Sequence, residues 1–257
     1  MSFTDKHPGQ PAHFIGLRNY IDLLAVDTAF FKVVKNTLVY TVGVVALRFV
    51  LGMVMALVLN ARIRFREFFR GWMLLPWIMP IVAATLTWTW ILNSRGVLNY
   101  ILMGLHIIET PIAWLAQPSV ALLSVIIASV WSGFPFFGIS LLAGMQAISE
   151  ELYEAAKVDG ASAIQRFRYV TLPGLKSVII VITVLSTIWV FNGFLRVWLI
   201  TGGGPGNSSD IIITYAYKQG LSGYRLGYGA AISLMFAPLL FLAVHFFTPL
   251  LVTEEGD

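Results

Sequence analysis

Three side chains lie on one stripe of the long apolar segment 175–200. Trp189, Asn192 and Arg196 follow one another at intervals of three and four residues, which is the spacing of a single helix face. An aromatic ring stacks well on the apolar face of a sugar, while an amide and a guanidinium bond its hydroxyls. Alternatively, Arg196 reaches the outer membrane interface and Trp189 packs against neighbouring helices. The residues favour either a solute path or ordinary packing, and both interpretations stay open.

Two further features interrupt apolar segments. Arg48 lies midway along the segment 33–60, where it either lines a path or pairs with a polar group of another helix. Trp131 begins the string Trp-Ser-Gly-Phe-Pro-Phe, and Pro135 in that string is expected to break the helix. Irregular backbone at membrane depth is tolerated in a water-filled cavity or inside packed protein. Trp131 is therefore a candidate for the solute path or for a packed kink.

Constellations for catalysis or metal binding are absent from the sequence. The four histidines are scattered, without the spacing that places two ligands on one helix face. No Asp or Glu lies inside an apolar segment, and there is no cysteine. The glycine-rich run 201–206 lacks the Lys-Ser or Lys-Thr that a nucleotide-binding loop requires. We expect a chain that is not an enzyme, with no catalytic residue, no metal site and no cofactor of its own.

The composition is that of a membrane protein. The 257 residues are 58% hydrophobic and only 12% charged, against roughly 25% charged in soluble domains. The net charge of +4 is too small to indicate a nucleic-acid partner, and the basic residues serve as topology signals instead. Membrane lipid is the partner that the composition predicts.

An all-α, polytopic fold with about five transmembrane helices is predicted, because a span needs ~20 apolar residues. The apolar segments are 33–60, 71–93, 119–143, 175–200 and 225–252. The first loop is crowded with Arg62, Arg64, Arg66 and Arg70, so it should be cytoplasmic. This predicts an extracytoplasmic lead-in at 1–31, a transmembrane domain at 32–252 and a cytoplasmic tail at 253–257.

A polar island at 149–173 separates the third and fourth apolar segments. Ser149 is a plausible N-cap, Gly160 suits the left-handed position that ends a helix, and Ser162 with Gln165 forms a capping box. Pro173 is expected to stop the second helix. Alanines at 155 and 156 keep one face shallow, so another protein can approach closely. The alternative is an amphipathic hairpin that lies on the membrane surface and only connects two spans.

The island resembles the EAA loop of importer-type ABC transporter permeases. The match comprises Glu-Ala-Ala at 154–156, Asp-Gly-Ala at 159–161 and Leu-Pro at 172–173, and its flanks resemble the carbohydrate-import branch. The Thr-Gly-Gly-Gly-Pro at 201–205 resembles a second motif of the same permeases. The string Phe-Ile-Gly-Leu-Arg-Asn-Tyr at 14–20 resembles a segment that follows the family's first transmembrane helix. By this resemblance, the family's first helix is missing here, either because the start site is truncated or because this protein lacks that helix.

The resemblance implies the ABC importer type I transmembrane fold, with the island as a cytoplasmic coupling helix-turn-helix. The implied partners are a second permease in a heterodimer, two ATPase subunits that bind ATP and Mg, and an extracytoplasmic solute-binding protein. The implied location is the cytoplasmic (inner) membrane of a prokaryote. The implied ATPase-coupling residues are Glu154, Ala155, Ala156, Asp159 and Gly160. The family often has an acid near position 196, so Arg196 departs from it.

The function that follows is the permease subunit of an ATP-driven importer, which moves a carbohydrate or related solute by alternating access. Three alternatives stay open from the residues themselves. They are an ABC permease for a non-sugar solute, a stand-alone channel or ion-coupled transporter, and a membrane-bound transferase. The transferase is disfavoured because it would need acids inside the spans as metal ligands.

Overall fold

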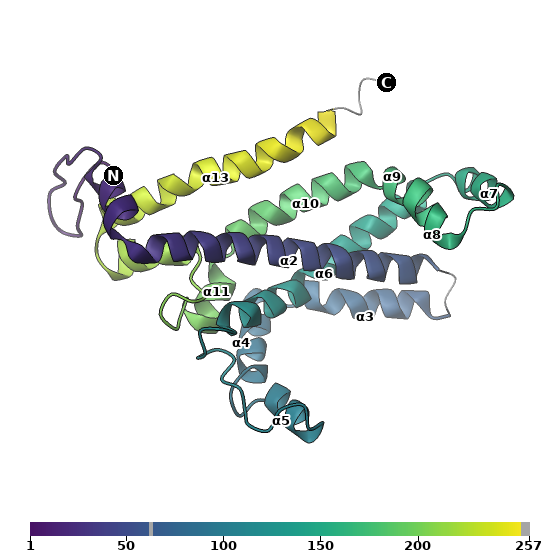
Figure 1. Cartoon of the computed structure of the whole chain (residues 1–257), viewed down its shortest axis with the longest axis horizontal. Coiled ribbons are helices and arrows are strands. Elements are labelled where there is room, and N and C mark those ends of the chain that lie inside the picture. The colour runs from purple at the N-terminus through teal and green to yellow at the C-terminus, as the bar shows by residue number, and fades with distance from the viewer. Residues whose placement is uncertain (62–63, 253–257) are drawn as a thin grey trace. The chain divides into compact units, whose positions relative to one another are not determined.

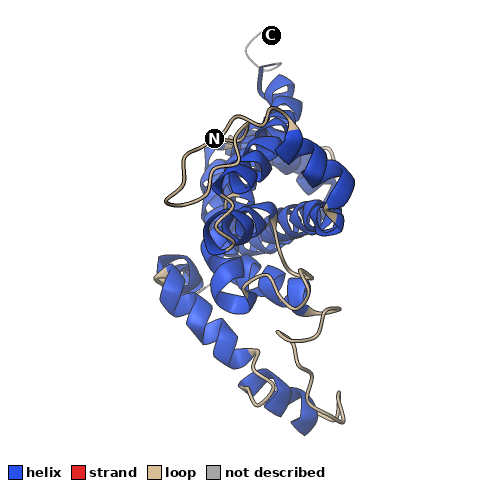
Figure 2. Ribbon diagram, turned by 90° about the vertical axis from the view of Figure 1, so that its left-hand side faces the viewer, coloured by secondary structure: helices blue, strands red, loops and turns tan. Residues whose placement is uncertain are grey.

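The fold is all-α, as predicted. A computed structural model of the chain describes residues 1–61 and 64–252, and all its regular elements in these ranges are helices (Figures 1 and 2). A single isolated bridge between Thr4 and Phe14 is the extended pairing found there. The predicted tail 253–257 lies outside the described residues. The helices in chain order are α1 (Arg18–Ile21), η1 (Asp22–Val26), α2 (Thr28–Asn60), α3 (Arg66–Ile78), α4 (Ile81–Ile91), α5 (Val97–Gly104), α6 (Ala121–Ala147), α7 (Glu150–Val158), α8 (Ala163–Arg166), η2 (Phe167–Thr171), α9 (Leu172–Gly174), α10 (Lys176–Phe191), α11 (Phe194–Thr201), α12 (Ile212–Tyr217), η3 (Lys218–Ser222) and α13 (Leu226–Val252).

Two of the described helices, α2 and α6, are long and apolar enough to cross a membrane by themselves. Two broken pairs pass the same test when each pair is taken as one span. One pair is α3 with α4. The other is the helical stretch Ala163–Gly174 with α10, and this second pair is bent by 65° at its junction. The remaining predicted span corresponds to α13, which begins within one residue of its expected start.

Two predicted spans are broken although the sequence analysis gave them as continuous, and a third is continuous although a break was expected. Segment 71–93 is interrupted at Pro80, which precedes α4 and has no N–H to continue the ladder of α3. Segment 175–200 is interrupted between α10 and α11, where Gly193 is the N-cap of α11. By contrast, Pro135 lies inside α6, so the expected break in the third span is wrong. A buried proline is tolerated in a membrane helix when neighbouring groups satisfy the freed carbonyl.

The described chain divides into two compact units, which are treated separately. Unit one comprises Met1–Val44, Pro80–Ser129 and Ile188–Ala243. Its main core cluster joins η1 and the start of α2 to α12 and the start of α13, through Leu23, Phe30, Val33, Ile212, Tyr215, Ala216, Tyr228 and Ile232. These segments are far apart in sequence, so the core fixes the outer end of the C-terminal helices to the first predicted span.

The loop between α4 and α6 is organised by one buried side chain in unit one. The amide of Asn99, on α5, donates to the carbonyl oxygens of Ser94 and Ile112 at 3.0 and 2.8 Å. Its oxygen accepts from the indole N–H of Trp114 at 2.9 Å. Helix α5 was not predicted, because eight residues of mixed polarity give no periodic signal.

Unit two comprises Val45–Met79, Val130–Thr187 and the chain from Val244. Here the second half of α2 crosses α6 at two glycines. A Cβ on Gly52 would overlap the Cβ of Phe137 and lie 2.9 Å from the backbone nitrogen of Gly138. A Cβ on Gly138 would in turn overlap the sulfur of Met55. Small residues permit such close backbone approach, which stabilises membrane helices by van der Waals packing.

The glycine crossing gives a first prediction. Gly52→Ala should destabilise the protein by about 1–3 kcal/mol, because the added methyl meets backbone atoms that cannot rotate away. The measurement is the midpoint of thermal unfolding in detergent, followed by size-exclusion chromatography. Gly71→Ala is the matched control, since nothing lies within 4 Å of its added Cβ. Equal midpoints for the two variants would contradict the tight crossing.

Candidate functional site

The polar island folds as the sequence predicted at its first helix. The Ser149 side chain accepts from the backbone N–H of Glu151 at 3.3 Å, and acids occupy the first turn of α7. Asp159 is the C-cap, and Gly160 follows with a φ of +77°. This left-handed conformation costs a side-chain-bearing residue roughly 1–2 kcal/mol, which explains the glycine. The turn that ends α7 is thus determined locally.

The second helix of the island starts as predicted and ends differently. Ser162 and Gln165 form the expected capping box, with bonds of 2.7 and 3.3 Å between side chain and backbone. Pro173 does not stop this helix, because the chain stays helical through η2 and α9 to Gly174. Pro173 occupies the first turn of α9, where a missing N–H costs least. The break comes at Leu175 instead.

Contacts within unit two hold the island against the start of α10. The hydroxyl groups of Tyr153 and Thr171 are 3.0 Å apart. Ile148 packs so closely on Gly174 that a Cβ there would lie 2.7 Å from its Cδ1. Because Thr171 and Gly174 directly precede α10, these contacts join the island to the start of that helix.

The implied coupling residues are presented to the surroundings. Glu154, Ala155, Asp159 and Gly160 are exposed, and Ala156 is half-buried on the side of α7 that carries Tyr153. Large apolar side chains of the island are also exposed, at Leu152, Val158, Ile164 and Tyr169. Val158 is 88% exposed, which is costly if water is the neighbour. Contacts among the described residues do not test their coupling role, which stays a prediction.

The four residues proposed for a solute path are not gathered on one helix face. Trp131 belongs to unit two, whereas Trp189, Asn192 and Arg196 belong to unit one. The break between α10 and α11 interrupts the stripe, because Arg196 lies on α11. The Asn192 amide donates to the carbonyl oxygen of Ile188 at 2.8 Å, and Trp189 is half-exposed. The continuous stripe is therefore wrong, while a role in the path stays a prediction.

Arg48 is enclosed by protein within unit two. It is 5% exposed, and its guanidinium donates to the hydroxyl of Ser186 on α10 at 3.2 Å. A Cβ on Gly133 of α6 would overlap the guanidinium. Of the two roles left open by the sequence, this geometry favours pairing between helices α2, α6 and α10.

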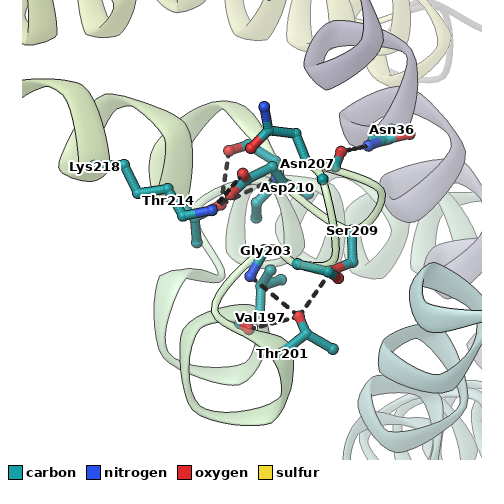
Figure 3. A network of polar contacts seen from close by, with 12 residues as sticks. Asn36, Val197, Thr201, Gly203, Asn207, Ser209, Asp210, Thr214 and Lys218 are labelled. Carbon is teal, nitrogen blue, oxygen red and sulfur yellow. Dashed lines mark hydrogen bonds and ion pairs between the residues drawn. The ribbon is translucent and has the colours of Figure 1, made fainter. Parts of the chain in front are cut away.

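A polar network in the outer loop of unit one is centred on Asp210, which is fully buried (Figure 3). Its carboxylate accepts from the Thr214 hydroxyl at 2.8 Å and from the Lys218 ammonium at 2.6 Å. Gly203 leaves room for this carboxylate, since a Cβ there would overlap it. Figure 3 shows Thr201 and Ser209 closing the same loop, with their hydroxyl oxygens 2.8 Å apart.

The start of α2 is hydrogen-bonded to the loop 201–211. Asn36 and Lys32 donate to the carbonyl oxygens of Asn207 and Gly206 at 2.9 and 2.8 Å. Asp27 caps α2 through Ala29 N–H and accepts from the phenols of Tyr215 and Tyr228. Burial, reinforced by this bond to Asp27, raises the pKa of Tyr215, so its phenol keeps the proton that it donates.

Sequence reasoning missed these outer-loop residues. Asp210 and Lys218 are charged residues of this loop in the sequence. They are eight positions apart, whereas neighbouring side chains on a helix are three or four positions apart, so the spacing did not predict their contact. The available signal was a lone acid within an otherwise apolar and glycine-rich stretch, because such an acid must find a partner if it is buried.

Comparisons with known proteins agree on one family. Residues 48–250 match the family described as the binding-protein-dependent transport system inner membrane component. The trehalose/maltose transport system permease protein MalF of Thermococcus litoralis is 39% identical over 226 residues, covering 86% of this chain and 74% of the relative. The diacetylchitobiose uptake system permease protein DasB of Streptomyces coelicolor is 32% identical, covering 94% and 74%.

A solved structure resembles the whole fold. It is the crystal structure of a bacterial ABC transporter involved in the import of the acidic polysaccharide alginate. One chain of it superposes with a TM-score of 0.84 at 26% identity, covering 96% of this chain and 86% of that one. The expected ABC importer type I fold is confirmed by this match.

The Asp210 network gives a second prediction. Asp210→Asn should destabilise the outer loop by about 1–3 kcal/mol, because Lys218, whose side chain is 26% exposed, loses its ion-pair partner. The measurement is hydrogen exchange of the backbone amides of residues 201–218, which should become faster. Glu109→Gln is the control, since it removes an exposed acid from another outer loop. Unchanged protection in Asp210→Asn would show that the pair does not hold the loop.

Proposed function

The chain belongs to the family of binding-protein-dependent transport system inner membrane components, and we propose that it is the permease subunit of an ATP-driven importer. Members of this family are membrane subunits and not enzymes. In the proposal, two ATPase subunits bind ATP and Mg, a second permease completes a heterodimeric pore, and a solute-binding protein delivers the cargo. The site of action is the cytoplasmic membrane.

The observation that carries the proposal is the exposed island anchored to α10. Helix α7 presents Leu152, Glu154 and Ala155 outward, while Tyr153 faces Thr171. A surface with small alanines between acidic and apolar side chains suits the groove of another protein, in which Glu154 makes a polar contact. Gly160 then turns the chain back without strain.

Movement of the docked ATPases would reach the spans through this joint. Closure of the ATPases on ATP displaces α7 as a rigid body, and the Tyr153–Thr171 contact carries the displacement to the bend at Leu175. Alternating access requires two discrete packings of the helices, biased by such a displacement. The chain itself supplies no catalytic group to this cycle.

We further propose a carbohydrate as the cargo. The support is that two of the relatives, 39% and 32% identical, are a trehalose/maltose permease and a diacetylchitobiose permease. Trp189 and Arg196 are candidates for contact with the sugar, whereas the amide of Asn192 is engaged by the backbone of its own helix. A ligand screen on the cognate binding protein identifies the cargo, and a consistent preference for amino acids or metal complexes would exclude sugars.

The docking of α7 is tested by cysteine crosslinking, which is clean because the chain has no cysteine. Ala155→Cys should crosslink to an ATPase subunit in native membranes, and the yield should change when ATP or a vanadate-trapped nucleotide is added. Ser222→Cys, exposed in the outer loop, is the control and should give no such product. Absence of an ATPase adduct from an intact complex at Ala155→Cys would refute docking at this helix.

The turn at Gly160 gives a separate prediction about coupling. Gly160→Val should lower solute uptake severalfold per ATP hydrolysed, because a β-branched residue is strained by about 1–2 kcal/mol or more at this φ. Gly160→Asn is the matched variant and should retain most uptake, since asparagine tolerates the left-handed conformation. Uptake and hydrolysis are measured together in proteoliposomes. Equal coupling in both variants would mean that the turn geometry is irrelevant to transport.

A further inference from the structure

An apolar groove of about 720 Å³ lies within unit two, between α3 and α6. Its walls include Phe68, Trp72 and Leu75 of α3, the C-cap residue Met79, and Trp131 and Phe134 of α6. Several of these side chains are half-exposed or more, and Trp72 is 63% exposed. Among the described residues that line it, none carries a charge, a hydroxyl or an amide.

The lining decides which class of molecule fits. A sugar in this groove would lose its hydrogen bonds to water and gain none from the walls, which is costly for each hydroxyl. An acyl chain has no such requirement and gains dispersion contacts with the aromatic rings. The groove is therefore suited to hydrocarbon, and Trp131 is better explained by this wall than by a solute path.

The charge at one end of the groove specifies the kind of lipid. Arg66 and Arg70 lie four residues apart in the first two turns of α3, one on each side of Phe68 in the sequence. The Nε atom of Arg66 is buried and has no hydrogen-bond partner among the described residues. Over 64–70, three arginines face a single acid, Glu67, and the N-terminus of α3 adds its positive dipole end.

The start of α3, at one end of the groove, lies on the side of the membrane that the sequence predicts to be cytoplasmic. Figure 1 shows the first turn of α3 at the same end of unit two as α7 and α8. The loop 61–70 has four arginines, and the segment 149–176 has Lys157, Arg166, Arg168 and Lys176. The positive-inside rule, which counts basic residues, therefore assigns both loops to the cytoplasm. Anionic lipids are attracted to basic clusters at this surface of a bilayer.

We propose that this groove binds an anionic phospholipid of the cytoplasmic leaflet, with its phosphate held by Arg66 and Arg70 and an acyl chain along Trp72. Two arginines suit an anionic head group by charge, and each basic residue near the surface is worth about fivefold in affinity. The proposal rests on the chain spanning a membrane, and it holds or fails independently of the cargo and of ATPase docking.

The test uses brominated lipids, which quench tryptophan fluorescence on contact. The full chain, with the subunits that purify with it, is placed in nanodiscs that contain dibrominated phosphatidylglycerol or dibrominated phosphatidylcholine. The signal of Trp72 is obtained by subtracting the spectrum of Trp72→Phe. We expect Trp72 to be half-quenched at a mole fraction of the anionic lipid at least fivefold lower than that of the zwitterionic lipid.

Variants separate head-group recognition from simple contact with the bilayer. The double variant Arg66→Gln, Arg70→Gln should lose the anionic preference, whereas Arg66→Lys, Arg70→Lys should keep much of it. Arg95→Gln removes an exposed arginine from an outer loop and should leave the preference unchanged. If the double variant does not fold, the wild-type preference should still fall severalfold at high salt, since charge attraction is screened.

Two results would overturn the proposal. Equal quenching by the two lipids would show that the arginines select no head group. Absence of Trp72 quenching by either lipid would show that protein, such as a second permease subunit, covers the groove.

Discussion

A backbone group inside a bilayer has no water to bond, so every interruption of a membrane helix must be satisfied by the chain itself. The break between α10 and α11 shows how this is done. The Asn192 side chain donates to the carbonyl oxygen of Ile188 at 2.8 Å, and the backbone N–H of Gly193 donates to that of Val190 at 3.0 Å. The side chain that the sequence marked as a candidate sugar contact is thus bonded to the last turn of its own helix, on a carbonyl that also accepts the Asn192 backbone N–H.

The same requirement explains why a proline alone does not decide whether a membrane helix breaks. Pro80 coincides with an interruption, because α3 ends two residues earlier and its last carbonyls are satisfied by turns such as Met79 N–H to Leu75. Pro135 is equally unable to donate, yet it is buried in the middle of an unbroken α6. The outcome depends on what packs around each proline, and this packing is set by residues that are distant in sequence.

Local features could be predicted, and long-range ones could not. The caps at Ser149, Ser162 and Gly160 depend on residues within a few positions, so the sequence contains the whole interaction. The bonds from Tyr215 and Tyr228 to Asp27 join residues 188 and 201 positions apart. No periodicity in the sequence predicts such pairs. The same holds for Arg48 and Ser186: the sequence showed that a buried arginine needs a partner, but not which residue it is.

Exposed apolar side chains have two different meanings at the end of unit two that carries α7 and the start of α3. Trp72 on α3 is favourable in contact with lipid, whereas Val158 on α7 is favourable only if another protein covers it. Charge separates the two surfaces. Helix α7 and its C-cap carry Glu150, Glu151, Glu154 and Asp159 against one basic residue, Lys157, which is four negative charges and one positive, a net of −3.

An anionic leaflet attracts the arginines of α3 and repels the acids of α7. This repulsion argues against the alternative in which α7 lies flat on the membrane surface as a mere connector. Helix α7 is repelled by anionic lipid, and its exposed apolar side chains, Leu152 and Val158, still need to be covered. A protein partner on the aqueous side covers them without bringing the acids of α7 close to the lipid head groups.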